Sequence, residues 1–187
     1  MSLDTRDGSA RRPLSPDDAL ARVRDVVGDS VTDLKLNFGQ VDCTCRPEEL
    51  VAVATALRDD ASLRCRFFTF LSGVDRSEFR DVGGGLEVLI HVYSPEHVFH
   101  VNVHVPVDAS EPRCPTISEV FHGARWQERE CHEMFGIEFE GHPGLSHLYL
   151  PEDFEGHPLR RSFKLPSRAI KEWPGAKDPE EAAAGGR

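Results

Sequence analysis

Two alternating runs at 86–93 and 98–105 constrain the fold of this chain more than any other feature. Apolar side chains recur at every second position of both runs, and the segment Ser-Pro-Glu-His at 94–97 is typical of a turn between them. Pairing Tyr93 with Val98 across this turn brings eight apolar side chains to one face: Leu86, Val88, Ile90, Val92, Phe99, Val101, Val103 and Val105. The pattern predicts an antiparallel hairpin with one buried face.

The opposite face of this hairpin carries polar and ring side chains. The predicted register places His91 opposite His100 and Glu87 opposite His104. Three histidines on one sheet face are a candidate metal site, so an independent metal-binding enzyme using His91, His100 and His104 is one hypothesis for function. The simpler interpretation is an outward face that is hydrated or packed on a partner, because no carboxylate is fixed between the rings.

The segment before this hairpin holds two predicted helices and a second hairpin. One helix begins at Ser15 and ends at Gly28, and another opens at Pro47. Between them, a two-residue turn at Gly39-Gln40 places six apolar side chains on one face: Leu34, Leu36, Phe38, Val41, Cys43 and Cys45. Residues 65–74 are apolar on both faces, which predicts a central strand.

A third helix is predicted at Ala124–Phe135, and Gly136 ends it. This order of elements predicts an α+β fold of two layers, with helices packed on a mixed, mostly antiparallel sheet of about five strands. We expect a core domain at 15–136, followed by an irregular arm at 137–173 that is rich in Pro and Gly.

Composition argues against several classes of protein. The net charge of −10 disfavours binding to nucleic acid or anionic lipid. No apolar run is long enough to span a membrane, and the apolar core of a signal peptide is absent, so we expect membrane contact only through a partner. Five cysteines without a Cys-x-x-Cys pair predict free, buried thiols. The ends at 1–14 and 174–187 are predicted to be flexible tails.

The predicted third helix does not carry a familiar catalytic pattern. His132 and Glu133 begin a zinc-protease motif, but Gly136 occupies the position of its second histidine. Adjacent helical side chains diverge by about 100°, so Cys131 and His132 do not form a catalytic pair.

Glu130 is the most unusual residue of this helix by pattern. A helical wheel places it inside an apolar arc formed by Trp126, Cys131, Met134 and Phe135. A carboxylate in such an arc needs a partner, and we expect either an ion pair with Arg160 or Arg161 or a contact with another chain. A catalytic role has less support, because no nucleophile or second acid is placed beside it.

The sequence Phe-Glu-Gly-His-Pro occurs twice, at 139–143 and 154–158. In each copy, Gly permits a positive φ and Pro forces the preceding His into an extended conformation, which predicts a locked turn. A metal site formed by His142, His147 and His157 is the alternative, but nothing fixes the spacing of these residues on one element.

The region 126–163 resembles the signature of a known family. Glu-Arg-Glu, an acid, an aromatic residue before Gly-Ile, and two Gly-His-Pro steps are similar to the C-type, or 30-kDa-type, subunit of proton-pumping NADH:quinone oxidoreductase, the bacterial respiratory complex I. Weaker similarity extends over 15–166, including Leu-Ser-Gly-Val-Asp at 71–75. The residues that the resemblance marks as a subunit interface are Glu128, Arg129, Glu130, Phe135, Gly136, Phe139, Gly141, His142, Pro143, Glu155, Gly156, His157, Pro158, Leu159, Arg160 and Arg161.

The resemblance implies a scaffold subunit of the peripheral arm, without catalytic residues, cofactors or metal of its own. FMN, iron–sulfur clusters and quinone are then expected in other subunits of a complex that transfers electrons from NADH to ubiquinone or menaquinone and translocates protons. The implied partners are the D-type (49-kDa-type) and B-type subunits of the same complex, on the cytoplasmic face of the plasma membrane.

The sequence departs from the family pattern at two places. His132 and Glu133 stand where relatives usually have an aromatic residue and Asp, and Ser146 and His147 stand where they have Arg-Arg. Because relatives also serve ferredoxin-, F420- and hydrogenase-linked complexes, the electron donor stays open. We predict that Glu130 and Arg160 are needed for assembly, and that residues after about 140 are loosely held in the isolated protein.

Overall fold

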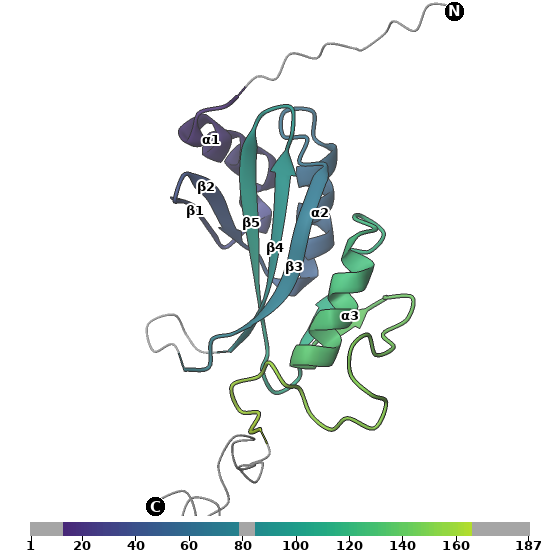
Figure 1. Ribbon diagram of the computed structural model, residues 1–187. Helices are drawn as coiled ribbons and strands as arrows, with labels where there is room; N and C mark the ends of the chain where they lie inside the picture. Colours follow the sequence, from purple (N-terminus) through teal and green to yellow (C-terminus); the bar gives the residue numbers. More distant parts are fainter. Residues whose placement is uncertain (1–12, 79–84, 166–187) are drawn as a thin grey trace, which may run out of the picture.

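The computed structural model describes residues 13–78 and 85–165, and its main feature is a five-stranded sheet in the order β1-β2-β5-β4-β3. Helices α1 and α2 lie behind this sheet in the view of Figure 1, and α3 lies beside β3. The strands are β1 (Asp33–Asn37), β2 (Gln40–Thr44), β3 (Phe67–Asp75), β4 (Leu86–Ser94) and β5 (Phe99–Val107). The helices are α1 (Pro16–Val27), α2 (Leu50–Asp59) and α3 (Ala124–Phe135).

The pairing of the strands confirms the predicted class. Strand β2 runs parallel to β5, whereas the β1–β2, β3–β4 and β4–β5 pairs are antiparallel, so the sheet is mixed and mostly antiparallel. The expected stripes of α1 and α2 are buried against it, for example at Val23 and Leu57. The five cysteines are free and buried, as expected. The fold is therefore α+β, with helices in the second layer.

The β4–β5 hairpin has the predicted faces but a different register. Ser94 pairs with Phe99, and the loop consists of residues 95–98 with Val98 at a positive φ of 57°. The predicted pairing of Tyr93 with Val98 is therefore wrong, because Tyr93 pairs with His100. A shift of two residues leaves every side chain on its own face, so the eight predicted apolar residues are all buried.

The β1–β2 hairpin corrects a predicted turn. Its two turn residues are Phe38 and Gly39, at φ values of 48° and 77°, and Asn37 pairs with Gln40. A two-residue hairpin of this type needs positive φ at both central positions, so Phe38 leaves the strand and is 99% exposed. The predicted turn at Gly39-Gln40, with Phe38 on the core face, is wrong.

Strand β3 lies at the edge of the sheet, which corrects its predicted central place. Its residues are apolar on both faces because each face has a separate partner. Phe68 stacks on Phe121 on the core side, and Phe70 stacks on His91 on the other side. Helix α3 borders this strand, where the N–H of Leu71 donates to Oε1 of Gln127.

Two short parallel strands flank α3 in the sequence, and a series of turns follows the second strand. Strand β6 (Arg113–Pro115) pairs with β7 (Glu138–Glu140), so the predicted arm at 137–173 begins with a strand. Residues 1–12 and 174–187 of the predicted tails, and 166–173 of the arm, lie outside the described residues. In the part of the chain that the structure describes, no helix has the length and apolar character needed to cross a membrane.

Candidate interaction surface on α3 and the arm

The buried stripe of α3 differs from the predicted one. Ala124, Glu128, Cys131 and Phe135 face the core at the spacing i, i+4, i+7, i+11, whereas Trp126 is 63% exposed. The predicted apolar arc is centred too far toward Trp126, because a pattern of apolar residues alone does not count a glutamate as core-facing. The spacing itself is the signal that could have identified Glu128 as a residue of the core face.

Glu128 ties α3 to the segment after β6. Its side chain is fully buried and accepts hydrogen bonds from the N–H of Ile117 at 2.8 Å and the hydroxyl of Thr116 at 2.5 Å. Burial raises the pKa of Glu128, although these two bonds act in the opposite direction. The first acid of the Glu-Arg-Glu signature is thus a buried structural link.

Glu133 is a second buried carboxylate, on a face of α3 that the arm covers. It accepts hydrogen bonds from the backbone N–H groups of Leu148, Tyr149 and Leu150 at 2.5–3.2 Å. Burial acts to raise its pKa, but the three N–H groups outweigh burial and hold the pKa of Glu133 below its ordinary value. Sequence reasoning missed this role, because its partners are backbone groups of an irregular segment.

Glu130 does not form the ion pair that its position in the helix predicted. Arg160 donates from Nε to the carbonyl of Phe135, and Arg161 bonds to Asp75 and Glu78. Within residues 13–78 and 85–165, no hydrogen bond or ion pair of the Glu130 carboxylate is present, and its side chain is half-buried. The alternative prediction, a contact with another chain, stays a prediction.

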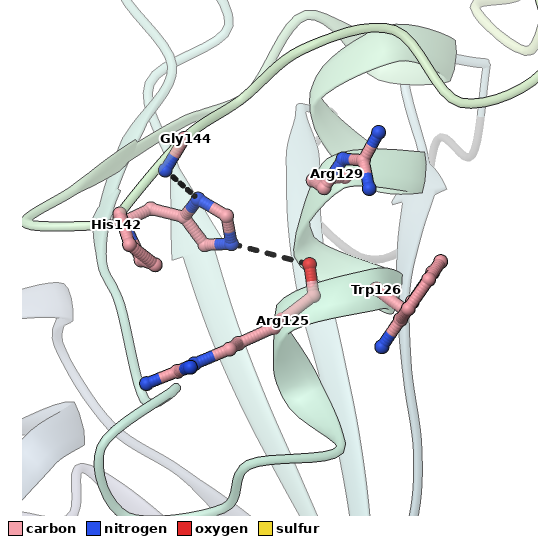
Figure 2. A pocket seen from close by; sticks show the side chains of 6 residues that line it. Arg125, Trp126, Arg129, His142 and Gly144 are labelled. Carbon is pink, nitrogen blue, oxygen red and sulfur yellow. Dashed lines mark hydrogen bonds between the residues drawn. The ribbon is translucent and has the colours of Figure 1, made fainter.

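The first Phe-Glu-Gly-His-Pro copy is held against the start of α3. Gly141 has a φ of 83°, which confirms the predicted turn. The His142 Nε2–H donates to the carbonyl of Arg125 at 3.1 Å, while its Nδ1 accepts from the N–H of Gly144 at 3.0 Å (Figure 2). Both ring nitrogens therefore have partners, which fixes the orientation of the ring.

The second copy caps the other end of α3. The last helical carbonyls, of Glu133, Met134 and Phe135, have no partners within the helix. They accept from Nδ1 of His157 at 2.9 Å, the N–H of Leu159 at 3.1 Å and Nε of Arg160 at 2.5 Å, respectively. The Gly-His-Pro-Leu-Arg motif is therefore a C-terminal cap whose residues come 24 or 25 positions further along the chain than the carbonyls they bind.

Gly136 makes this cap possible. Its φ of 69° ends the helix in the left-handed conformation, and a Cβ at this position would collide with the ring of His157. The His157 ring thus lies where only glycine leaves room.

Neither histidine set forms the metal site considered from the sequence. His142, His147 and His157 bond to three different carbonyls, of Arg125, Pro151 and Glu133. Among the described residues, no group of three or more His, Cys, Asp or Glu side chains is arranged to hold a metal ion.

On the sheet, the three histidines divide into two groups. His100 Nδ1 lies 3.1 Å from His91 Nε2, whereas His104 Nδ1 lies 2.6 Å from Oε1 of Glu87. The sequence predicted both contacts, but between residues directly opposite each other. Because the register is shifted by two residues, the contacting side chains are diagonal neighbours instead. Burial, and then the neighbouring His100, lower the pKa of His91.

A hollow of about 400 Å³ lies where the first Phe-Glu-Gly-His-Pro turn meets α3 (Figure 2). Arg129 lies with its guanidinium carbon 5.7 Å from the centre of the Trp126 ring, and donates to the carbonyls of Ser146 and His147 and the Ser146 hydroxyl. Ser146 and His147, which depart from the family pattern, are thus bound by Arg129 through two backbone oxygens and one hydroxyl. The hollow is lined by Arg125, Trp126, Arg129, His142, Pro143 and Gly144.

Comparison with solved structures supports the fold. The protein superposes on a trypsin-resistant fragment of Nqo5 with a TM-score of 0.56 at 24% identity, covering 68% of this chain and 99% of the fragment. A component of the membrane-bound sulfane sulfur reductase, an archaeal respiratory membrane complex, gives a TM-score of 0.60 at 19% identity, covering 78% and 85% of the two chains. Both share the α+β architecture described above.

Comparison of sequences identifies the family. The model of the family described as respiratory-chain NADH dehydrogenase, 30 Kd subunit, matches residues 43–169, so the protein belongs to this family. The NADH-quinone oxidoreductase C subunit of Salinispora tropica is 34% identical over 165 residues, which are 87% of this chain and 65% of the relative. The corresponding C subunit of Roseiflexus castenholzii is 36% identical over 151 residues, 81% and 85% of the two chains. The sequence thus spans just under two thirds of the length of the Salinispora relative.

Proposed function

We propose that this protein is a scaffold subunit in the peripheral arm of a membrane-associated NADH:quinone oxidoreductase. The observation that carries the proposal is how the signature residues are used. Glu133, His142, His157 and Arg160 fasten α3 and the arm to each other through hydrogen bonds. Glu128 ties the same helix to the segment after β6. These bonds fix the surface that α3 and the arm form together. A structural subunit needs such a fixed surface to bind its neighbours.

The exposed side chains of this surface support a contact with other subunits. We call the outward side of α3 and of residues 137–165 the α3–arm surface. Trp126 and Tyr149 are 63% and 64% exposed, and Leu159 and Leu165 are exposed as well. Large apolar side chains gathered on one surface are typical of protein interfaces. The predicted arm at 137–173 is then the subunit-contacting segment.

In the proposed complex, the partners are the D-type (49-kDa-type) and B-type subunits, on the cytoplasmic side of the membrane. FMN, iron–sulfur clusters and quinone are then bound by other subunits, and this protein binds none of them. The names of the sequence relatives support the NADH-linked complex.

A second candidate keeps the scaffold role in a complex with another electron donor, linked to ferredoxin, F420 or hydrogenase. It is favoured by one observation, namely that a membrane-bound sulfane sulfur reductase contains a component of the same fold. The fold alone therefore does not choose between the two complexes.

The test is purification of a tagged full-length protein from native membranes, followed by mass spectrometry. We expect the 49-kDa-type and B-type subunits in stoichiometric amounts, together with NADH-oxidising activity. Recovery of the tagged protein alone would refute the scaffold role, and recovery with subunits of a ferredoxin-linked complex would establish the second candidate.

The matched variant in this experiment is Arg160→Ala, which removes a donor from the C-terminal cap of α3. We expect a lower yield of assembled complex, with unchanged turnover in the complex that does assemble. Asp25→Asn, at an exposed position on α1, is the control and keeps the full yield. Normal assembly of Arg160→Ala with a loss of catalytic rate alone would contradict the proposal.

A further inference from the structure

Two hollows of opposite charge lie next to each other on the α3–arm surface, and Trp126 lines both. The first has two basic residues, Arg125 and Arg129, in its lining. The second, of about 440 Å³, is here called the acidic hollow, because the carboxylate of Glu130 is its charged group. It is lined by Trp126, Gln127, Glu130, Leu148 and Tyr149.

The walls of the acidic hollow are joined to each other by contacts within this protein. Trp126 and Glu130 are one helical turn apart, so their side chains lie on the same side of α3. Leu148 and Tyr149 form the opposite wall, and their N–H groups are bonded to Glu133. The hollow therefore combines a rigid helix with a loop that the same helix anchors.

The electrostatics of this hollow favour a cation. Glu130 has no ion-pair or hydrogen-bond partner among the residues that the structure describes. The nearby Arg129 is directed to the Trp126 ring and to Ser146 and His147. An acidic group that lines the same hollow as two exposed aromatic rings suits a basic side chain, because the carboxylate pairs with the charge and the ring faces attract it.

We propose that a basic side chain of a neighbouring subunit enters the acidic hollow, forms an ion pair with Glu130 and packs against Trp126 and Tyr149. This inference rests on the proposed function, since the neighbour is a subunit of the same complex. A protein partner fits better than a free cation, because a single carboxylate is a weak ligand set and Trp126, Leu148 and Tyr149 line the same hollow.

The first test is photo-crosslinking in the assembled complex. Tyr149 is replaced by p-benzoylphenylalanine, membranes are irradiated, and the crosslinked peptide is sequenced. We expect a peptide of another subunit with Arg or Lys next to the crosslinked residue. A partner peptide without a basic residue, a crosslink within this protein, or no crosslink while the same probe at Leu159 reacts would each overturn the inference.

The second test reverses the charges. Glu130→Lys should lower the yield of complex about tenfold or more, because a buried ion pair becomes a repulsive contact. Changing the crosslinked basic residue of the partner to Glu should restore assembly in the Glu130→Lys background. Glu152→Lys, an exposed position on the arm outside the acidic hollow, is the control and should keep the wild-type yield.

Failure of the proposed function and failure of the ion pair at Glu130 give different results. If the wild-type tagged protein recovers no oxidoreductase subunit, the proposed function fails. If it recovers the complex and Glu130→Lys does so equally well, the proposed function stands and only the inference about the acidic hollow is wrong.

Discussion

Glu133→Gln should release the arm from α3 without unfolding the core. Glu133 accepts bonds from three consecutive backbone N–H groups, at Leu148, Tyr149 and Leu150, in a buried site. A hydrogen bond to a charged group contributes about 1.5–3 kcal/mol. Gln has the same shape and keeps one accepting oxygen, but it loses the charge and turns an NH2 group toward donors. We therefore expect the docking of this segment to weaken by about 2 kcal/mol.

The assay is hydrogen–deuterium exchange with mass spectrometry on the full-length protein. A loss of about 2 kcal/mol corresponds to roughly 30-fold faster exchange at the amides of 148–150, because about 1.4 kcal/mol is a factor of ten. Strand β5 should keep its protection. Glu130→Gln, three residues earlier on the same helix, is the control and should leave exchange at 148–150 unchanged. Unchanged exchange in Glu133→Gln would refute the anchoring role.

The same carboxylate predicts a pH dependence. Because the pKa of Glu133 is lowered in the folded protein, its contribution is complete above the ordinary value of about 4.3 and is lost as pH falls through the lower folded pKa. Exchange at 148–150 should therefore accelerate, after correction for the intrinsic rate, below about pH 4 in the wild type. It should be independent of pH in the Gln variant.

Three further substitutions test the packing. Gly136→Ala should lower Tm by about 5–10 °C in thermal denaturation, because it strains a left-handed position and displaces His157; an unchanged Tm would contradict the cap. Gly73→Ala should cost about 1–3 kcal/mol in urea titration, since a Cβ there collides with Phe135, and the exposed Ser72→Ala is its control. His91→Phe should remove the loss of stability expected as pH falls below about 6.5, because the lowered pKa of His91 favours its neutral form; an equal pH slope in both proteins would argue against it.

Patterns with a strict period predicted the fold well. The alternation in β4 and β5 identified the buried face correctly even though the register was wrong, because a shift of two residues preserves the faces. What the pattern did not contain was turn geometry. The positive φ of Phe38 and Val98 depends on closure of each hairpin, and neither residue type signals it.

Features that depend on partners far along the sequence were harder to predict. The composition of β3 is typical of a central strand because it is apolar on both faces, yet α3 and the ring stack supply its apolar neighbours. The helical wheel places Glu130 inside an apolar arc, whereas Glu128 and Glu133 are the acids that are buried in the structure. Their partners are mostly backbone N–H groups of irregular segments, which a helical wheel does not include.

We propose that neighbouring subunits cover the α3–arm surface. Hydroxyl-radical footprinting of Trp126 and Tyr149 measures this directly, in the isolated protein and in the purified complex, with the exposed Phe38 as an internal reference. We predict that both side chains react readily in the isolated protein and become strongly protected in the complex. Equal reactivity of Trp126 and Tyr149 in the two samples would contradict the claim.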